Sequence, residues 1–113
     1  MISEYSFGRM VINDIPYQND LIVFGDTVLD NWRRNSGHQL SVADIKNAVE
    51  RFNPAVVVVG SGKFGMMKLL PETESFLISL QIRLIIQKTQ HAVTTFNELR
   101  ISDRPMGAFH LTC

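Results

Sequence analysis

A glycine-rich loop after a run of four valines is the stretch of the chain best suited to hold a ligand. The segment Gly60-Ser61-Gly62-Lys63-Phe64-Gly65 directly follows Val56-Val57-Val58-Val59. Glycines let a backbone approach a ligand closely, the amides of such a loop attract anions, and Lys63 adds a positive charge. Open α/β sheets hold ligands at the carboxyl ends of their strands. We therefore predict a small binding crevice near the Gly60–Gly62 loop.

The glycine spacing matches two nucleotide-binding motifs, but the neighbouring residues fit neither of them. A dinucleotide-binding motif needs a helix directly after the glycines and an acidic residue about 20 positions further on. Here residues 66–70 intervene before Pro71, and Ile86-Gln87-Lys88 carries no acid. An ATP-binding P-loop needs Lys and then Ser or Thr where Met66-Met67 stands. We therefore expect no specific binding of NAD, FAD or ATP, and no cofactor.

Three further residues are candidates for the walls of the same crevice. The stretch from Asp30 to His38 has no periodicity and is rich in side chains that recognise ligands, among them Trp32 and His38. Trp32 is either a recognition aromatic beside Arg33-Arg34 or a ring that seals the edge of the core. Thr89 is expected either to cap a helix whose free amides favour anionic groups or to donate its hydroxyl to the site.

Histidine and cysteine residues do not have the spacing of a metal site. His110 and Cys113 are three residues apart on a predicted strand, so their side chains point to opposite faces of it. The same direction argument disfavours Cys113 and His110 as a nucleophile and its base. We expect no metal.

The bulk properties exclude several classes of protein. The 113 residues include 11 Lys and Arg and 11 Asp and Glu, so the chain lacks the positive charge expected of a nucleic-acid binder. A neutral surface makes a homo-oligomer possible. The single cysteine, Cys113, indicates a reducing compartment. No apolar run approaches a membrane span, and the first residues do not resemble a signal peptide, so a cytoplasmic location is expected.

The pattern of elements predicts one α/β domain over residues 1–113. Short strands at 10–12 and 15–17 flank Asn13-Asp14, a pair suited to a two-residue hairpin, and Pro16 places the second of them at an edge. Helical spacing after Ser41, at 71–80 and from Thr89 to Leu99 alternates with strands at 55–60, 82–86 and 106–112. This order predicts right-handed crossovers and a mostly parallel central sheet with packed helices, preceded by N-terminal antiparallel hairpins.

The chain resembles the domain-of-unknown-function family numbered 498, which includes adipogenesis-associated Mth-type domain proteins and a mitochondrial complex I assembly factor. The matching residues, in chain order, are Gly8-Arg9, Trp32, Gly37-His38, Val59-Gly60-Ser61-Gly62, Thr89, Ala92-Val93, Phe96-Asn97 (Tyr-Asn in most of the family) and Phe109-His110-Leu111-Thr112-Cys113. The resemblance implies a compact Mth-type α/β domain with a mixed central sheet and no established enzymatic activity. The assembly role is not transferred, because the first residues are not expected to act as a mitochondrial presequence.

Three functions are compatible with these observations. The leading hypothesis is a non-catalytic binding or assembly module for a protein partner or a small anionic ligand. The alternatives are a small enzyme with its site among Trp32, His38, Ser61, Lys63 and Thr89, and a structural subunit of a homo-oligomer. The predicted ligand-binding residues are Trp32, His38, Gly60, Ser61, Gly62, Lys63 and Thr89.

Overall fold

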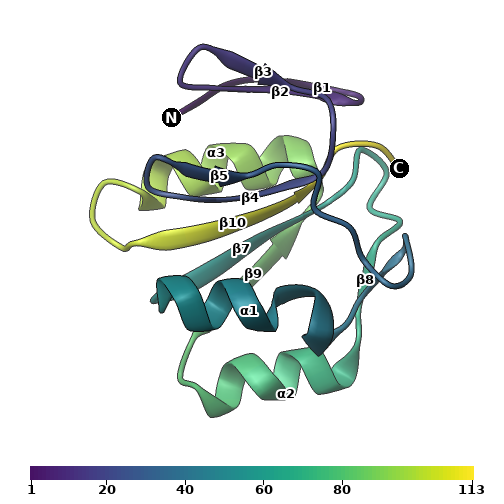
Figure 1. The fold of residues 1–113 in the computed structure, drawn as a ribbon, viewed down its shortest axis with the longest axis vertical. Helices are drawn as coiled ribbons and strands as arrows, with labels where there is room; N and C mark the ends of the chain where they lie inside the picture. Colours follow the sequence, from purple (N-terminus) through teal and green to yellow (C-terminus); the bar gives the residue numbers. More distant parts are fainter.

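A mixed five-stranded sheet forms the centre of the molecule (Figure 1). The computed structural model describes residues 1–113, and the strand order is β5-β4-β10-β7-β9. Strand β7 is parallel to β10 and β9, whereas β4 is antiparallel to β10 and β5. The mixed central sheet that the family resemblance implies is confirmed. The strands are β4 (Leu21–Phe24), β5 (Thr27–Leu29), β7 (Val56–Ser61), β9 (Arg83–Gln87) and β10 (Pro105–His110).

The valine run occupies β7, which lies between β10 and β9 with both faces covered. Successive side chains of a strand point to opposite faces, so the four valines serve two cores. Val57 and Val59 belong to one hydrophobic cluster, and Val56 and Val58 belong to the other. Each of the four is at most 2% exposed. The predicted interior position of this strand is therefore confirmed.

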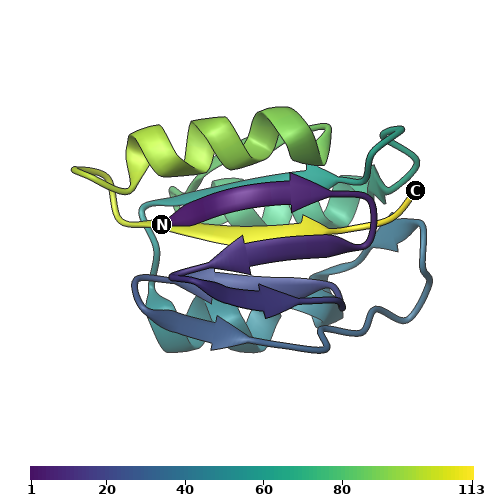
Figure 2. The same cartoon turned by 90° about the horizontal axis from the view of Figure 1, so that it is seen from above.

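Different elements cover the two faces of the central sheet. Helices α1 (Val42–Phe52) and α2 (Pro71–Ser79) pack on one face (Figure 1). Helix α3 (Thr89–Leu99) and a three-stranded antiparallel sheet lie side by side on the other face (Figure 2). That small sheet consists of β1 (Ile2–Ser6), β2 (Arg9–Ile12) and β3 (Ile15–Tyr17). None of the helices is long and apolar enough to span a membrane.

The β2–β3 hairpin has the predicted turn, and α3 holds the neighbouring strand β1. Asn13 and Asp14 have φ values of 50° and 68°, as a two-residue turn of positive φ requires. Pro16 lies in β3, at the edge of the small sheet. On the other side of this sheet, the Ile2 amide donates to Asn97 Oδ1 at 3.0 Å, and Asn97 Nδ2 donates to the Ile2 carbonyl at 2.7 Å. The Asn97 side chain thus pairs with β1 as a neighbouring strand would.

Two features differ from the sequence prediction. Lys88 occupies the N-cap position of α3, so Thr89 is the first helical residue and does not cap the helix. Its hydroxyl instead bonds to other segments. The loops before α1 and α2 also pair with each other through β6 (Gln39–Leu40) and β8 (Lys68–Leu69), which are parallel. Strands of two residues are too short to produce a periodic signal.

Candidate functional site

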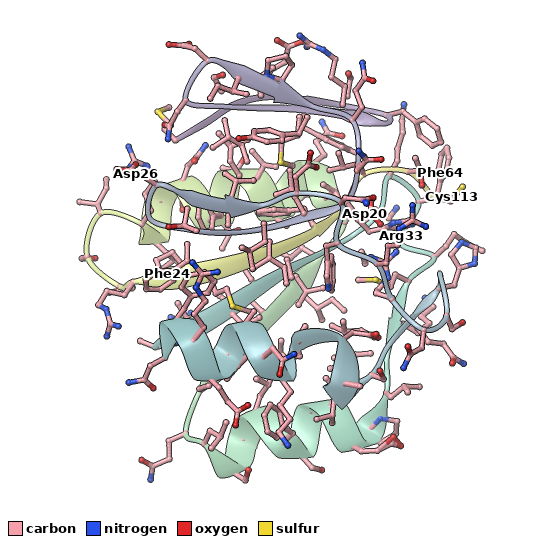
Figure 3. All side chains as sticks on the ribbon, in the orientation of Figure 1. Asp20, Phe24, Asp26, Arg33, Phe64 and Cys113 are labelled. Carbon is pink, nitrogen blue, oxygen red and sulfur yellow. The ribbon has the colours of Figure 1, made fainter.

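The carboxyl ends of three parallel strands meet at one edge of the central sheet, the carboxyl edge. Strands β7, β9 and β10 end there at Ser61, Gln87 and His110. Strand β4 runs the opposite way and begins there, with Leu21 opposite Phe109, so Asp20 lies at the same edge. In Figure 3 this is the end at which Asp20, Arg33, Phe64 and Cys113 are labelled.

The glycine loop and the start of α3 meet at this edge, as the sequence predicts. The Thr89 amide donates to the Gly62 carbonyl at 3.1 Å, and the Gly62 amide donates to Thr89 Oγ1 at 2.8 Å. Thr89 Oγ1 also donates to the His110 carbonyl at 2.6 Å, and Ser61 Oγ donates to the Gln87 carbonyl at 3.1 Å. Both hydroxyls are therefore used to join segments of the protein.

The space that the glycines leave is filled by other parts of the chain. A Cβ atom on Gly60 would lie 2.8 Å from both Phe109 Cδ1 and Thr89 Oγ1. A Cβ atom on Gly62, whose φ is +100°, would lie 2.3 Å from the Cys113 carbonyl carbon. The two main hollows of the molecule lie at the other edge of the sheet, where Val56 and Pro105 begin their strands. The close backbone approach expected at Gly62 is therefore made to the segment after β10.

Replacing Gly62 with Ala is expected to destabilise the protein by at least about 2 kcal/mol, because it adds backbone strain to a steric clash. Urea unfolding of three alanine variants separates the two effects. Gly37 has neither positive φ nor a close neighbour, whereas Gly25 has a φ of +58° in open space. We expect the loss to increase from Gly37→Ala to Gly25→Ala to Gly62→Ala. A Gly62→Ala variant no less stable than Gly25→Ala contradicts the close packing.

A buried polar cluster of Asp20, Arg34 and His110 underlies the carboxyl edge. Asp20 Oδ2 lies 2.7 Å from His110 Nδ1 and 2.8 Å from Arg34 Nη2. Asp20 Oδ1 accepts the Leu111 amide at 2.7 Å. The Arg34 and His110 side chains are 4% and 7% exposed, and that of Asp20 is 17% exposed. The carboxylate thus joins the start of β4, the 30–38 loop and the end of β10.

The short Asp20–His110 contact determines the arrangement of protons. A carboxylate only accepts hydrogen bonds, so Nδ1 of His110 carries the proton and donates it to Asp20. The 3.1 Å separation between Arg34 Nη2 and His110 Nδ1 then reflects two donors sharing one carboxylate oxygen. His110 Nε2 and Arg34 Nη1 are buried and have no hydrogen-bond partner within the protein.

The pKa of Asp20 is lowered by this cluster. Burial acts in the opposite direction and raises it, but hydrogen bonds from His110, the Leu111 amide and Arg34 together outweigh the burial. Nearby, the pKa of Tyr5 is raised, first by burial and then by the negative charge of Asp20. The Tyr5 hydroxyl donates to the Leu111 carbonyl at 2.9 Å. Strand β1 is therefore also tied to this edge.

Trp32 and His38 each contact one member of the buried cluster: Trp32 contacts Arg34, and His38 contacts His110. The Trp32 ring packs against the core, its Nε1 donates to the Asp44 carbonyl at 2.9 Å, and the Arg34 guanidinium lies 4.7 Å from the ring centroid. The structure thus places Trp32 at the edge of the core with a cationic neighbour, Arg34, and a role of the ring in recognition stays a prediction. The exposed His38 ring lies edge-on to His110, with centroids 6.1 Å apart.

Above the buried cluster, the carboxyl edge presents an apolar and basic rim. We define the rim as Phe7, Lys63, Phe64, Met66 and Lys88. Phe7, Phe64 and Met66 are 49%, 61% and 48% exposed, and the two phenyl centroids are 6.5 Å apart. Neither lysine forms an ion pair: the only salt bridges of the chain are Arg9–Glu4, Arg34–Asp20 and His110–Asp20. In Figure 3, Phe64 projects outward beside Cys113.

Sequence analysis missed several of these residues. Asp20, Tyr5 and Phe7 were not predicted, Arg34 was considered only as a cationic neighbour of Trp32, and His110 only as a metal ligand or a base. A signal for Asp20 exists, because it directly precedes the apolar run Leu21-Ile22-Val23-Phe24, which has the composition of a strand. Its position becomes informative only once that strand is known to pair antiparallel with the last strand of the chain. No group of three or more His, Cys, Asp or Glu side chains is placed to hold a metal ion.

The family described as protein of unknown function (DUF498/DUF598) matches residues 2–111. The chain belongs to this family. No curated protein matches the sequence.

Solved structures with the same fold come from archaea and bacteria. A conserved hypothetical protein from Pyrococcus horikoshii OT3 is 23% identical, with a TM-score of 0.81, and the alignment covers 100% of this chain and 99% of that one. A Bordetella parapertussis protein is 21% identical, with a TM-score of 0.84 and coverage of 96% and 92%. A Mth938-like domain of Bordetella pertussis is 17% identical, with a TM-score of 0.80 and coverage of 98% and 85%. At these identities the likeness shows a shared fold.

Proposed function

We propose that this domain is a non-catalytic binding module whose rim docks an acidic, partly apolar segment of a partner protein. The observation that carries the proposal is the Phe7–Phe64 pair, two exposed rings from segments far apart in the sequence that lie together at one edge. Large exposed apolar side chains that cluster on a surface are typical of interaction sites, whereas isolated ones are common anywhere.

The charges of the rim favour an acidic partner. The chain carries 11 basic and 11 acidic residues, so its net charge is zero, yet Lys63 and Lys88 of the rim have no acidic partner. Electrostatic complementarity would steer a carboxylate-bearing segment to this edge and fix its orientation. The apolar side chains of that segment would cover Phe7, Phe64 and Met66.

The buried cluster supports docking by making the rim rigid. Asp20, His110 and Arg34 join β4, β10 and the 30–38 loop, while the Lys63 amide donates to the Thr112 carbonyl at 2.7 Å. The Met66 amide donates to the Cys113 carbonyl at 3.0 Å. A surface that is already ordered loses less conformational entropy on binding.

The hydroxyl groups favour a binding role over the enzyme alternative. A nucleophile needs a free hydroxyl beside a base. Ser61 and Thr89 each donate their hydroxyl proton to a backbone carbonyl. The Asp20–His110 pair has the orientation of an acid–base pair, but His110 Nε2 is buried and has no hydroxyl partner. Ion-pair networks that hold a structure together also shift pKa values, so the lowered pKa of Asp20 is consistent with a positioning role.

The test is affinity capture from source cells with tagged wild-type, Phe64→Ser and Ile101→Ser proteins. Ile101 is 83% exposed and follows α3 at the opposite edge, so Ile101→Ser is the matched control. We expect Phe64→Ser to weaken partner binding on the order of tenfold or more, because a central aromatic carries much of the energy of an interface. Lys88→Glu should weaken the same complex. Added salt should also lower the affinity of this variant less than it lowers the affinity of the wild-type protein.

Two results would contradict this proposal. Equal capture of the same partner by wild type and Phe64→Ser would show that the rim does not dock it. If instead wild type sediments as a dimer and Phe64→Ser as a monomer, the rim joins two copies of this chain, and the structural-subunit alternative replaces the proposal. Circular dichroism melting of each variant establishes that loss of binding is not loss of folding.

A further inference from the structure

A hollow lies at the amino edge of the central sheet, opposite the rim, where β4 ends and β10 begins. Its volume is about 230 Å³, and β2, the β4–β5 turn, α3 and the start of β10 line it. Figure 3 shows two of its lining residues, Phe24 and Asp26, at the end of the molecule away from Asp20 and Phe64. The hollow is therefore separate from the proposed docking surface.

The inner wall of this hollow is apolar. Ile12, Val23 and Phe96 line it and are 2%, 1% and 3% exposed. Phe24 and Pro105 complete the hydrophobic lining. Ligand sites are typically concave, mostly apolar surfaces with a few polar groups that fix the orientation of the ligand. The volume restricts the occupant to a small molecule, since pockets for drug-sized ligands begin at about 300 Å³.

Two arginines stand at the mouth of the hollow. Arg100 follows the last helical residue of α3, and Arg104 immediately precedes β10. Neither of them forms an ion pair with a carboxylate of the protein. The Arg104 guanidinium lies 5.8 Å from the centroid of the Phe24 ring, and its Nη2 donates to the Asn53 carbonyl at 3.2 Å. Asp26 is the single acidic residue of the lining, so the lining side chains carry a net positive charge.

The backbone at Arg104 is unusual for an arginine. Its φ is 49°, in the left-handed region that glycine and asparagine adopt at lower cost. Placing an arginine at position 104 therefore costs backbone energy that a glycine there would not cost. Met1 also belongs to the lining, and the pKa of its exposed amine is lowered, first by partial burial and then by the positive charge of Arg100.

We propose that this hollow binds a small organic carboxylate whose apolar body lies against Ile12, Val23 and Phe96 and whose carboxylate faces Arg100 and Arg104. Guanidinium groups present paired N–H donors that match the two oxygens of a carboxylate. The larger hollow nearby, of about 360 Å³, shares Arg104 but has only Ala55 and Val56 as hydrophobic lining. It offers no comparable surface to an apolar body.

The experiment is a titration of ¹⁵N-labelled protein with hexanoate, followed by two-dimensional NMR. Two further probes separate the parts of the ligand. Hexanol keeps the apolar chain but has no carboxylate, and acetate keeps the carboxylate but has no apolar chain. We expect hexanoate to shift the amides of Val23, Phe24, Phe96 and Arg100 in a saturable manner, with hexanol weaker and acetate without a saturable effect. Arg100→Gln and Arg104→Gln should each raise the dissociation constant of hexanoate about tenfold, the value of one charged hydrogen bond.

Arg33→Gln is the matched control, since Arg33 is exposed and lies at the carboxyl edge, at the end of the molecule away from Phe24 and Asp26 (Figure 3). It should leave hexanoate binding unchanged. The proposal is overturned if hexanoate produces no saturable shift, if its shifts lie elsewhere, or if Arg33→Gln weakens binding as much as Arg104→Gln. Because Phe64→Ser leaves this hollow intact, its hexanoate affinity should equal that of wild type, whatever becomes of the proposed partner.

Discussion

Val58→Asp is expected to yield no folded protein. Val58 is completely buried in β7, with neighbouring strands on both sides and packed elements on both faces. An unpaired carboxylate there costs several kcal/mol, which is comparable with the total stability of about 5–15 kcal/mol of an ordinary domain. Soluble expression and the circular dichroism spectrum measure the effect. Val57→Asp, on the opposite face of the same strand, should behave in the same way.

The matched control for these variants is Ile101→Asp, which introduces the same charge at a residue that is 83% exposed. It should be expressed and should melt as wild type does, because surface substitutions usually change stability by only about 0.5 kcal/mol. Soluble, normally melting protein from both valine variants contradicts the interior placement of β7.

Local signals made most of the fold predictable. The valine run, the Asn13-Asp14 turn and the helical spacing of Val42, Ile45 and Val49 each depend on residues close together in the sequence. The structure places β7, the hairpin and α1 where these patterns indicate. The capping box between Ser41 and Asp44 is also present. Such features are encoded within one element, so a single sequence is sufficient to find them.

The site was less predictable, because its residues meet only through the strand order. The contact between the Gly62 loop and Thr89 could be predicted, because right-handed crossovers make β7 and β9 parallel and bring their carboxyl ends together. Asp20 and His110 are 90 residues apart and touch only because β4 pairs with β10. Likewise, Phe7 and Phe64 meet through the folding of the N-terminal sheet over the central one. Nothing in the local sequence marks these pairs.

Asp20→Asn is expected to cause the largest loss of stability among substitutions in the polar cluster. The change keeps the shape of the side chain but removes the charge that faces Arg34 and His110, whose side chains are only 4% and 7% exposed. Removing one partner of a buried ion pair leaves the other uncompensated, so we expect a loss on the order of 3 kcal/mol in urea unfolding at pH 7. Glu4→Gln, which removes the exposed ion pair with Arg9, is the control and should have little effect.

The pH dependence provides a second measurement of the same interaction. The pKa of Asp20 is lowered from its ordinary value of 3.8 in the folded protein. Its contribution to the free energy of unfolding is therefore fully present above pH 3.8 and is lost as the pH falls through the lower, folded-state pKa. The difference in stability between wild type and Asp20→Asn should accordingly be constant from pH 7 to about 5 and shrink in stronger acid. A difference that is small at pH 7, or that does not change in acid, would show that Asp20 does not hold the carboxyl edge together.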